Sequence, residues 1–314
     1  MDEQLRLNRI PLGWKMLTSR GGYVEAARSL NRDADLVLKW ASERSAAVQA
    51  FELSMPEREM YLQQVHRSQS ALSALGEPEL QSVVVRPDVR RAVPLIDQSW
   101  LKTKTLDEAA SVAAQRLLWR LDLPSSGAVD ALREPETGPV GRMAETQSGL
   151  MIFAGDGKQV ASLAIMLHEM GHYLYETFMG AEAAGTVWRC VGSEGAALSL
   201  ATLGVAEYLH GDDDRRGDAS SWESYCRSEH WLIHYYFLLE ASELGLCEIP
   251  AGDLCMPYLR ETYLHSVGYQ YVYARAASET AGREAVVLRQ LSQRLNGSTR
   301  QASTEPMHDL TAQY

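Results

Sequence analysis

The feature that most constrains this chain is a pair of histidines inside a long apolar segment. His168 and His172 stand four residues apart, Glu169 follows the first of them, and residues 163–167 are all apolar. On an α-helix, side chains four residues apart lie on one face, so both imidazoles can reach one metal ion. A helix this apolar is buried almost all round, and burying two imidazoles without a partner is unfavourable. The segment therefore predicts a helix over about 158–179 that carries two metal ligands.

Glu169 occupies a position that suits proton transfer better than metal binding. It comes directly after His168, so it lies beside the metal site without being needed as a ligand. From there it can accept a proton from metal-bound water, which is the role of a general base. The alternative interpretation is an amphipathic helix whose two histidines are buried and hydrogen-bonded without a metal.

A third protein ligand is expected, because a catalytic zinc ion usually takes three and leaves one position for water. Glu176 lies on the same helix but two turns beyond His168, which strains a common site. Glu182 follows shortly after the turn expected at Gly180. Both carboxylates are candidates for the third position.

Glu194 is the candidate that we favour as third ligand. It lies 22 residues after His172 at the start of a helix predicted over about 193–210, among glycines and alanines. Two antiparallel helices would bring its carboxylate back over the histidines, and the small neighbours would allow close packing. We therefore predict that His168, His172 and Glu194 bind Zn²⁺. The alternative for Glu194 is a first-turn glutamate that is favoured by the helix dipole.

A tyrosine-rich segment near the C-terminus adds a third element to this pattern. It contains His265, Gly268, Tyr269, Tyr271 and Tyr273. Together, the histidine pair with its glutamate, the downstream glutamate and this segment resemble the thimet oligopeptidase and oligoendopeptidase F family of zinc peptidases. The carboxypeptidase Taq family is a near relative. The resemblance covers about residues 146–290, and it includes a strand before the histidine helix, expected here at 149–154 as an edge strand.

The resemblance implies a mainly α-helical fold in which a zincin-like catalytic lobe has a small sheet edge. It also implies a hydrolase that cleaves peptide bonds in short or unfolded peptides, with Zn²⁺ as cofactor and a peptide as partner. The histidine and the tyrosines would donate hydrogen bonds to the developing oxyanion. In such an enzyme Glu169 would pass its proton to the departing amine.

The resemblance does not determine which tyrosine is catalytic. Tyr271 and Tyr273 match the oligoendopeptidase version, whereas Tyr269 after a glycine matches the thimet version. If a helix continues over about 256–296, then His265, Tyr269 and Tyr273 follow at four-residue steps and share a face. Tyr271 would then point about 160° away from Tyr273. Helical geometry favours the first three residues, with Tyr271 as the alternative.

The rest of the chain predicts a helical N-terminal lobe. Helices are expected over about 23–51, 56–75 and 105–121, and residues 83–85 could form a short strand or an extended connector. Residues 124–141 are dense in proline and glycine, which is typical of a loop between lobes. We therefore predict an N-terminal lobe over residues 1–145 and a zinc-binding catalytic lobe over 146–314.

Composition excludes several classes of function. The chain has 30 Lys and Arg against 41 Asp and Glu, a net charge of −11, which argues against a nucleic-acid partner. Its apolar stretches are shorter than a membrane span requires. The N-terminus lacks the features of a secretory signal, and the four cysteines lack paired spacing, which favours a cytoplasmic location. The sequence does not predict an oligomeric state.

A second group of histidines and glutamates lies on a helix predicted over about 221–244, and we interpret its members mainly as packing residues: Glu229, His230, His234 and Glu240.

The zinc site itself has two alternative interpretations. It could serve a non-proteolytic step, such as hydrolysis of a small amide in a biosynthetic pathway. It could also be purely structural, but a structural site would not need the base Glu169.

Overall fold

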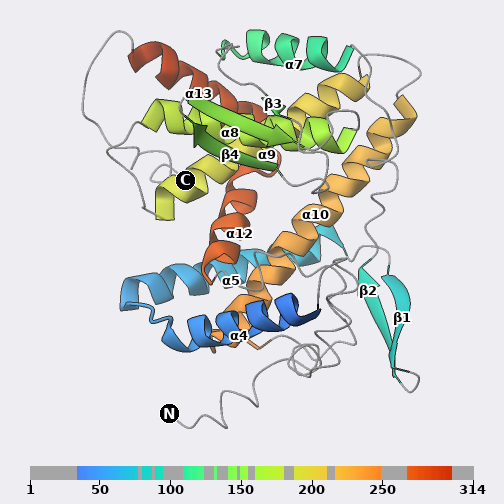
Figure 1. Cartoon of the computed structure of the whole chain (residues 1–314), viewed down its shortest axis with the longest axis vertical. Helices are drawn as coiled ribbons and strands as arrows, with labels where there is room; N and C mark the ends of the chain where they lie inside the picture. The colour runs from blue at the N-terminus through green and yellow to red at the C-terminus, as the bar shows by residue number, and fades with distance from the viewer. Residues whose placement is uncertain are drawn as a thin grey trace. The chain divides into compact units, whose positions relative to one another are not determined.

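The computed structural model describes residues 34–76, 80–86, 89–94, 109–123, 131–132, 141–146, 149–154, 160–179, 187–210, 216–248 and 267–298. Over these residues the chain is mainly helical, as predicted (Figure 1). It divides into two compact units, residues 1–100 with 217–281 and residues 101–216 with 282–314. This division does not follow the predicted lobes 1–145 and 146–314, because each unit takes segments from both halves of the chain.

The first unit contains helices and one hairpin. Its elements are α4 (Ala34–Ala50), α5 (Met55–Leu75), β1 (Leu80–Arg86), β2 (Val89–Pro94), nearly all of α10 (Arg216–Glu243) and α12 (Tyr269–Thr280). Strands β1 and β2 pair antiparallel as a sheet of two strands. The start of α5 follows the sequence rule for a helix N-terminus, with a serine before the helix and a proline in its first turn. Ser54 caps it, and the carboxylate of Glu57 accepts the Ser54 backbone N–H at 2.8 Å.

Aromatic packing and a buried ion cluster hold this unit together. The rings of Tyr61 on α5 and Tyr271 on α12 stack at 4.5 Å, and Phe237 of α10 packs against both. The buried guanidinium of Arg44 on α4 forms ion pairs with Glu240 and Glu243 on α10. Since both carboxylates come from one helix, this single arginine fixes α4 against α10.

The helix expected over 256–296 is interrupted in the structure. α12 begins only at Tyr269, and its N-cap residue Gly268 has a positive φ of 92°, a conformation that glycine adopts readily. A second helix, α13 (Glu284–Ser298), follows after a turn that contains Gly282, with φ 71°. Among the described residues, this region therefore forms two helices and not one continuous helix. His265 lies outside the described residues.

The second unit packs helices beside a small sheet. Its elements are α7 (Ala109–Arg120), β3 (Ala131–Leu132), β4 (Gly141–Thr146), β5 (Gly149–Ala154), α8 (Val160–Met179), α9 (Val187–His210) and α13. The strand order is β3-β5-β4, with β3 parallel and β4 antiparallel to β5. Residues 149–154 thus form the middle strand of the three and not the predicted edge strand. β4 and β5 lie against α8, and α9 contacts α7, α8 and α13 (Figure 1).

The contact between α8 and α9 is unusually close. A Cβ atom added to Gly171 on α8 would stand 2.4 Å from the Cα of Ala197 on α9, closer than real side chains allow. Gly204 on α9 likewise leaves room for the Leu167 side chain of α8. Small residues therefore bring the two backbones together where the predicted metal ligands lie. α9 begins at Val187, so Glu194 lies in its second turn and not in the first turn as predicted.

No helix in the described ranges is both long enough and apolar enough to cross a membrane.

Candidate metal centre

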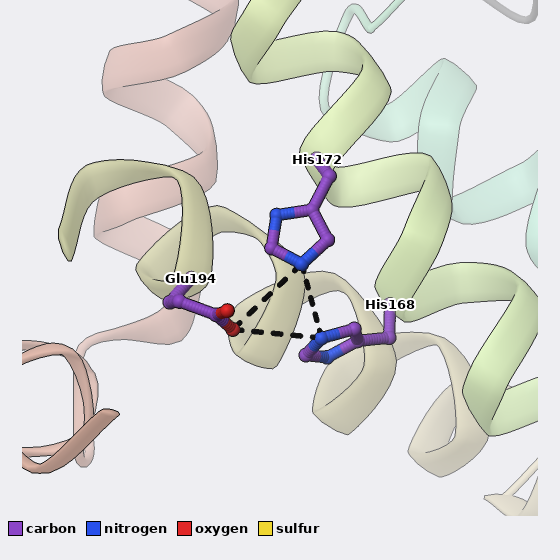
Figure 2. Close-up of side chains that lie close together, drawn as sticks. All are labelled: His168, His172 and Glu194. Carbon is purple, nitrogen blue, oxygen red and sulfur yellow. Dashed lines mark hydrogen bonds and ion pairs between the residues drawn. The ribbon is translucent and has the colours of Figure 1, made fainter. Parts of the chain in front are cut away.

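Three of the predicted ligands converge in the second unit. The Nε2 atoms of His168 and His172 lie 3.2 Å apart. The Oε2 atom of Glu194 lies 3.5 Å from the first and 3.7 Å from the second. Figure 2 shows the carboxylate reaching from α9 toward the two imidazoles on α8. The structure therefore brings the three predicted ligand side chains together.

The distances between the three ligand atoms match the distances between ligands around a tetrahedrally coordinated metal ion. Zinc binds histidine nitrogen at about 2.0–2.1 Å and carboxylate oxygen at about 2.0–2.2 Å. At a tetrahedral angle, two such ligand atoms lie about 3.3–3.6 Å apart. The observed 3.2, 3.5 and 3.7 Å fit three edges of that tetrahedron, and the distances to Glu194 are longer than an ordinary hydrogen bond. The three residues could hold a metal ion with little movement.

Burial of the three side chains matches their predicted role. Glu194 is 7% exposed, whereas His168 and His172 are 20% and 17% exposed, so the imidazoles retain a path to solvent. Burial lowers the pKa of His172 to about 4, which keeps its imidazole neutral near pH 7. The neutral imidazole is the form that binds metals.

A hydrogen bond from α9 also reaches His172. Its Nδ1 atom lies 2.8 Å from the Oγ atom of Ser193, the residue before Glu194. Ser193 is buried. Sequence reasoning passed over Ser193, because a serine in a helix has no spacing that distinguishes it from an ordinary buried hydroxyl.

The alternative third ligands are not part of this cluster. Glu176 forms an ion pair with Arg189 at the start of α9, which directs its carboxylate to that arginine. Glu182 lies outside the described residues. Among the described residues, His168, His172 and Glu194 are the one group of three or more histidines, cysteines or acids whose ligand atoms converge.

Glu169 is buried on α8, directly after His168. Burial raises the pKa of its carboxyl from 4.5 to about 7. A carboxyl with a pKa near the working pH can both accept and return a proton, which is the property required of a general base.

The predicted oxyanion residues belong to the other unit. Tyr269 and Tyr273 lie one turn apart on α12, with ring centroids 5.1 Å apart, and both are partly exposed. Tyr271 points elsewhere, because its ring is buried in the stack with Tyr61. The expected difference in direction between Tyr271 and its two neighbours is thus confirmed. The contact of Tyr269, Tyr273 and His265 with a substrate stays a prediction.

The second histidine cluster serves packing, as we interpreted it. His234 is buried, and its Nδ1 atom lies 3.0 Å from the hydroxyl of Ser68 on α5. Glu240 forms the ion pair with Arg44 and accepts the Gly268 backbone N–H at 3.1 Å. Glu229 accepts a hydrogen bond from Tyr225 at 2.8 Å. These three contacts go to different partners, and within the described part of the chain they do not form a common group of ligand atoms.

Comparison of the chain with protein-family models, curated proteins and solved structures finds no match to any of them. The resemblance to the oligopeptidases therefore depends on the residues of the sequence pattern alone.

Proposed function

We propose that this protein is a zinc-dependent metallopeptidase that hydrolyses peptide bonds in short or unfolded peptides. The observation that carries the proposal is the triangle of two imidazole nitrogens and one carboxylate oxygen with edges of 3.2–3.7 Å. Nitrogen and oxygen ligands in this number are typical of catalytic zinc sites. In this proposal His168, His172 and Glu194 hold the ion in a zincin-like lobe with a small sheet edge. When bound, zinc lowers the pKa of a water molecule to about 7 and polarises the carbonyl of the substrate.

Glu169 is the proton carrier of the proposed reaction. Its carboxylate accepts a proton from the attacking water and returns it to the nitrogen of the departing amine. The raised pKa of about 7 supports this role, because the side chain then changes protonation near neutral pH. A site that bound zinc for structure alone would not need a buried, proton-accepting carboxyl beside it.

The proposal assigns oxyanion stabilisation to His265, Tyr269 and Tyr273. Partial exposure of Tyr269 and Tyr273 supports their part in it, since a hydroxyl must reach the substrate to donate a hydrogen bond. Tyr271 is not assigned, because its ring is enclosed by the aromatic stack of the first unit.

Hydrolysis of a panel of quenched fluorescent peptides tests this function. We expect the zinc-loaded wild type to cleave some of them, and Glu169→Gln to lose about 10²–10⁴-fold in turnover with zinc still bound. Glu176→Gln is the matched control on the same helix and should retain activity, since glutamine can still accept a hydrogen bond from Arg189.

Two results would contradict the proposal. Near-wild-type turnover in Glu169→Gln would show that Glu169 is not the general base. If the fully zinc-loaded wild type cleaves no peptide, the protein is not a peptidase, and hydrolysis of a small amide becomes the favoured function.

A further inference from the structure

One hydrogen bond at the metal centre has no role in the proposed reaction. The Oγ atom of Ser193 lies 2.8 Å from Nδ1 of His172, whereas the other ring nitrogen, Nε2, is the atom that faces His168 and Glu194. The imidazole therefore has one nitrogen directed at the cluster and the other directed at a hydroxyl. This is the arrangement in which a histidine ligand donates its second N–H to a neighbouring acceptor.

The orientation of the ring determines which nitrogen carries the proton. A metal ion needs the lone pair of Nε2, so the hydrogen of the neutral ring must be on Nδ1. Nδ1–H then donates to the Ser193 oxygen, which can accept because a hydroxyl has two lone pairs.

Ser193 and Glu194 are consecutive residues of α9, and the close contact of α9 with α8 at Gly171 and Ala197 brings both within reach of His172. One turn of α9 therefore supplies the carboxylate and also a hydrogen-bond acceptor for a histidine of α8. If α8 shifted or rotated against α9, both contacts would change together.

We propose that Ser193 is a positioning residue of the metal centre. Its Oγ accepts the Nδ1 proton of His172, which fixes one tautomer and holds Nε2 toward Glu194. The inference rests on the zinc site of the proposed function, but it concerns metal affinity and not peptide cleavage. Outer hydrogen bonds of this kind typically contribute about 10- to 100-fold in metal affinity.

Zinc affinity, measured by competition with a chromogenic chelator, tests the proposal. We expect Ser193→Ala to bind zinc about 10- to 100-fold more weakly than the wild type. The matched control is Ser199→Ala, which removes another buried hydroxyl of α9 that has no hydrogen-bond partner among the described residues. This control should retain wild-type affinity. A Ser193→Ala protein within about twofold of the wild type would overturn the proposal.

A measurement on the metal-free wild type covers the case in which Ser193→Ala does not fold. Nitrogen NMR of ¹⁵N-labelled histidine at pH 7 reports the tautomer of His172 directly. Free imidazole side chains favour a proton on Nε2, so a His172 found with its proton on Nδ1 would support the proposal, and one protonated on Nε2 would overturn it.

The outcomes separate this inference from the proposed function. A wild type that binds zinc but cleaves no peptide contradicts only the peptidase function. A wild type that binds zinc no more tightly than Ser193→Ala contradicts only the role of Ser193. A wild type that binds no zinc at all contradicts both.

Discussion

At the scale of single residues, the candidate metal centre combines ionisable groups whose pKa values are shifted in opposite directions by their surroundings. Burial lowers the pKa of His172 to about 4 and raises that of Glu169 to about 7, so each is favoured in its uncharged form. The sequence predicted the identities of these residues through their spacing. It could not predict Ser193, because the bond to His172 depends on how two helices meet.

The raised pKa of Glu169 predicts a pH-dependent stability. The unfolded carboxyl loses its proton near pH 4.5, whereas the folded one keeps it up to about pH 7, so wild-type stability falls as the pH rises across that window. Glutamine cannot ionise. Without metal, Glu169→Gln should therefore gain about 2–3 kcal/mol relative to the wild type between pH 5 and pH 8.

Urea unfolding of the chelator-treated proteins at these two pH values measures the difference. A stability difference that is the same at pH 5 and pH 8 would show that the carboxyl of Glu169 is not held in its neutral form by the fold.

At the scale of helices, the close approach of α8 and α9 builds the centre. Sequence patterns predicted these helices and the capped start of α5, because apolar periodicity and capping residues act locally. They missed the early start of α9 at Val187, although Thr186, directly before it, is a residue type favoured at helix N-caps. They also missed the positive φ of 92° at Gly268, directly before α12, because apolar and aromatic residues lie on both sides of this glycine in the sequence.

Gly171→Ala tests this contact between helices. Helix propensity alone predicts a gain of about 0.5–1 kcal/mol for alanine. The added Cβ would meet backbone atoms of Ala196 and Ala197 at 2.4–2.8 Å, so the helices must separate. We therefore expect a loss of about 1–3 kcal/mol or more in unfolding free energy, and weaker zinc binding.

Gly204→Ala is the matched control, because the three atoms nearest to its new Cβ would belong to the Leu167 side chain, with the Cδ1 methyl group at 2.4 Å, and not to the backbone. Thermal unfolding and zinc titration of the two variants decide the comparison. Equal behaviour of Gly171→Ala and Gly204→Ala would contradict a special role for the backbone contact at Gly171.

At the scale of the whole molecule, sequence order was a poor guide to organisation. The boundary predicted at residue 145 rested on a segment rich in proline and glycine, but the chain returns to its first unit through α10 and α12. Contacts such as Arg44 with Glu243, 199 residues apart in the sequence, depend on tertiary packing. No local pattern of residues encodes such a pairing. The cluster of His168, His172 and Glu194 could be predicted because each of its two helices carries its own sequence signal.

The zinc content of dialysed protein tests whether His168, His172 and Glu194 bind zinc. We expect about one zinc ion per chain in the wild type and in Glu176→Gln. We expect almost none in His168→Ala or His172→Ala, and a severe loss in Glu194→Ala, because each removes an atom of the 3.2–3.7 Å triangle. Full zinc content in Glu194→Ala together with its loss in Glu176→Gln would show that Glu194 is not the third ligand.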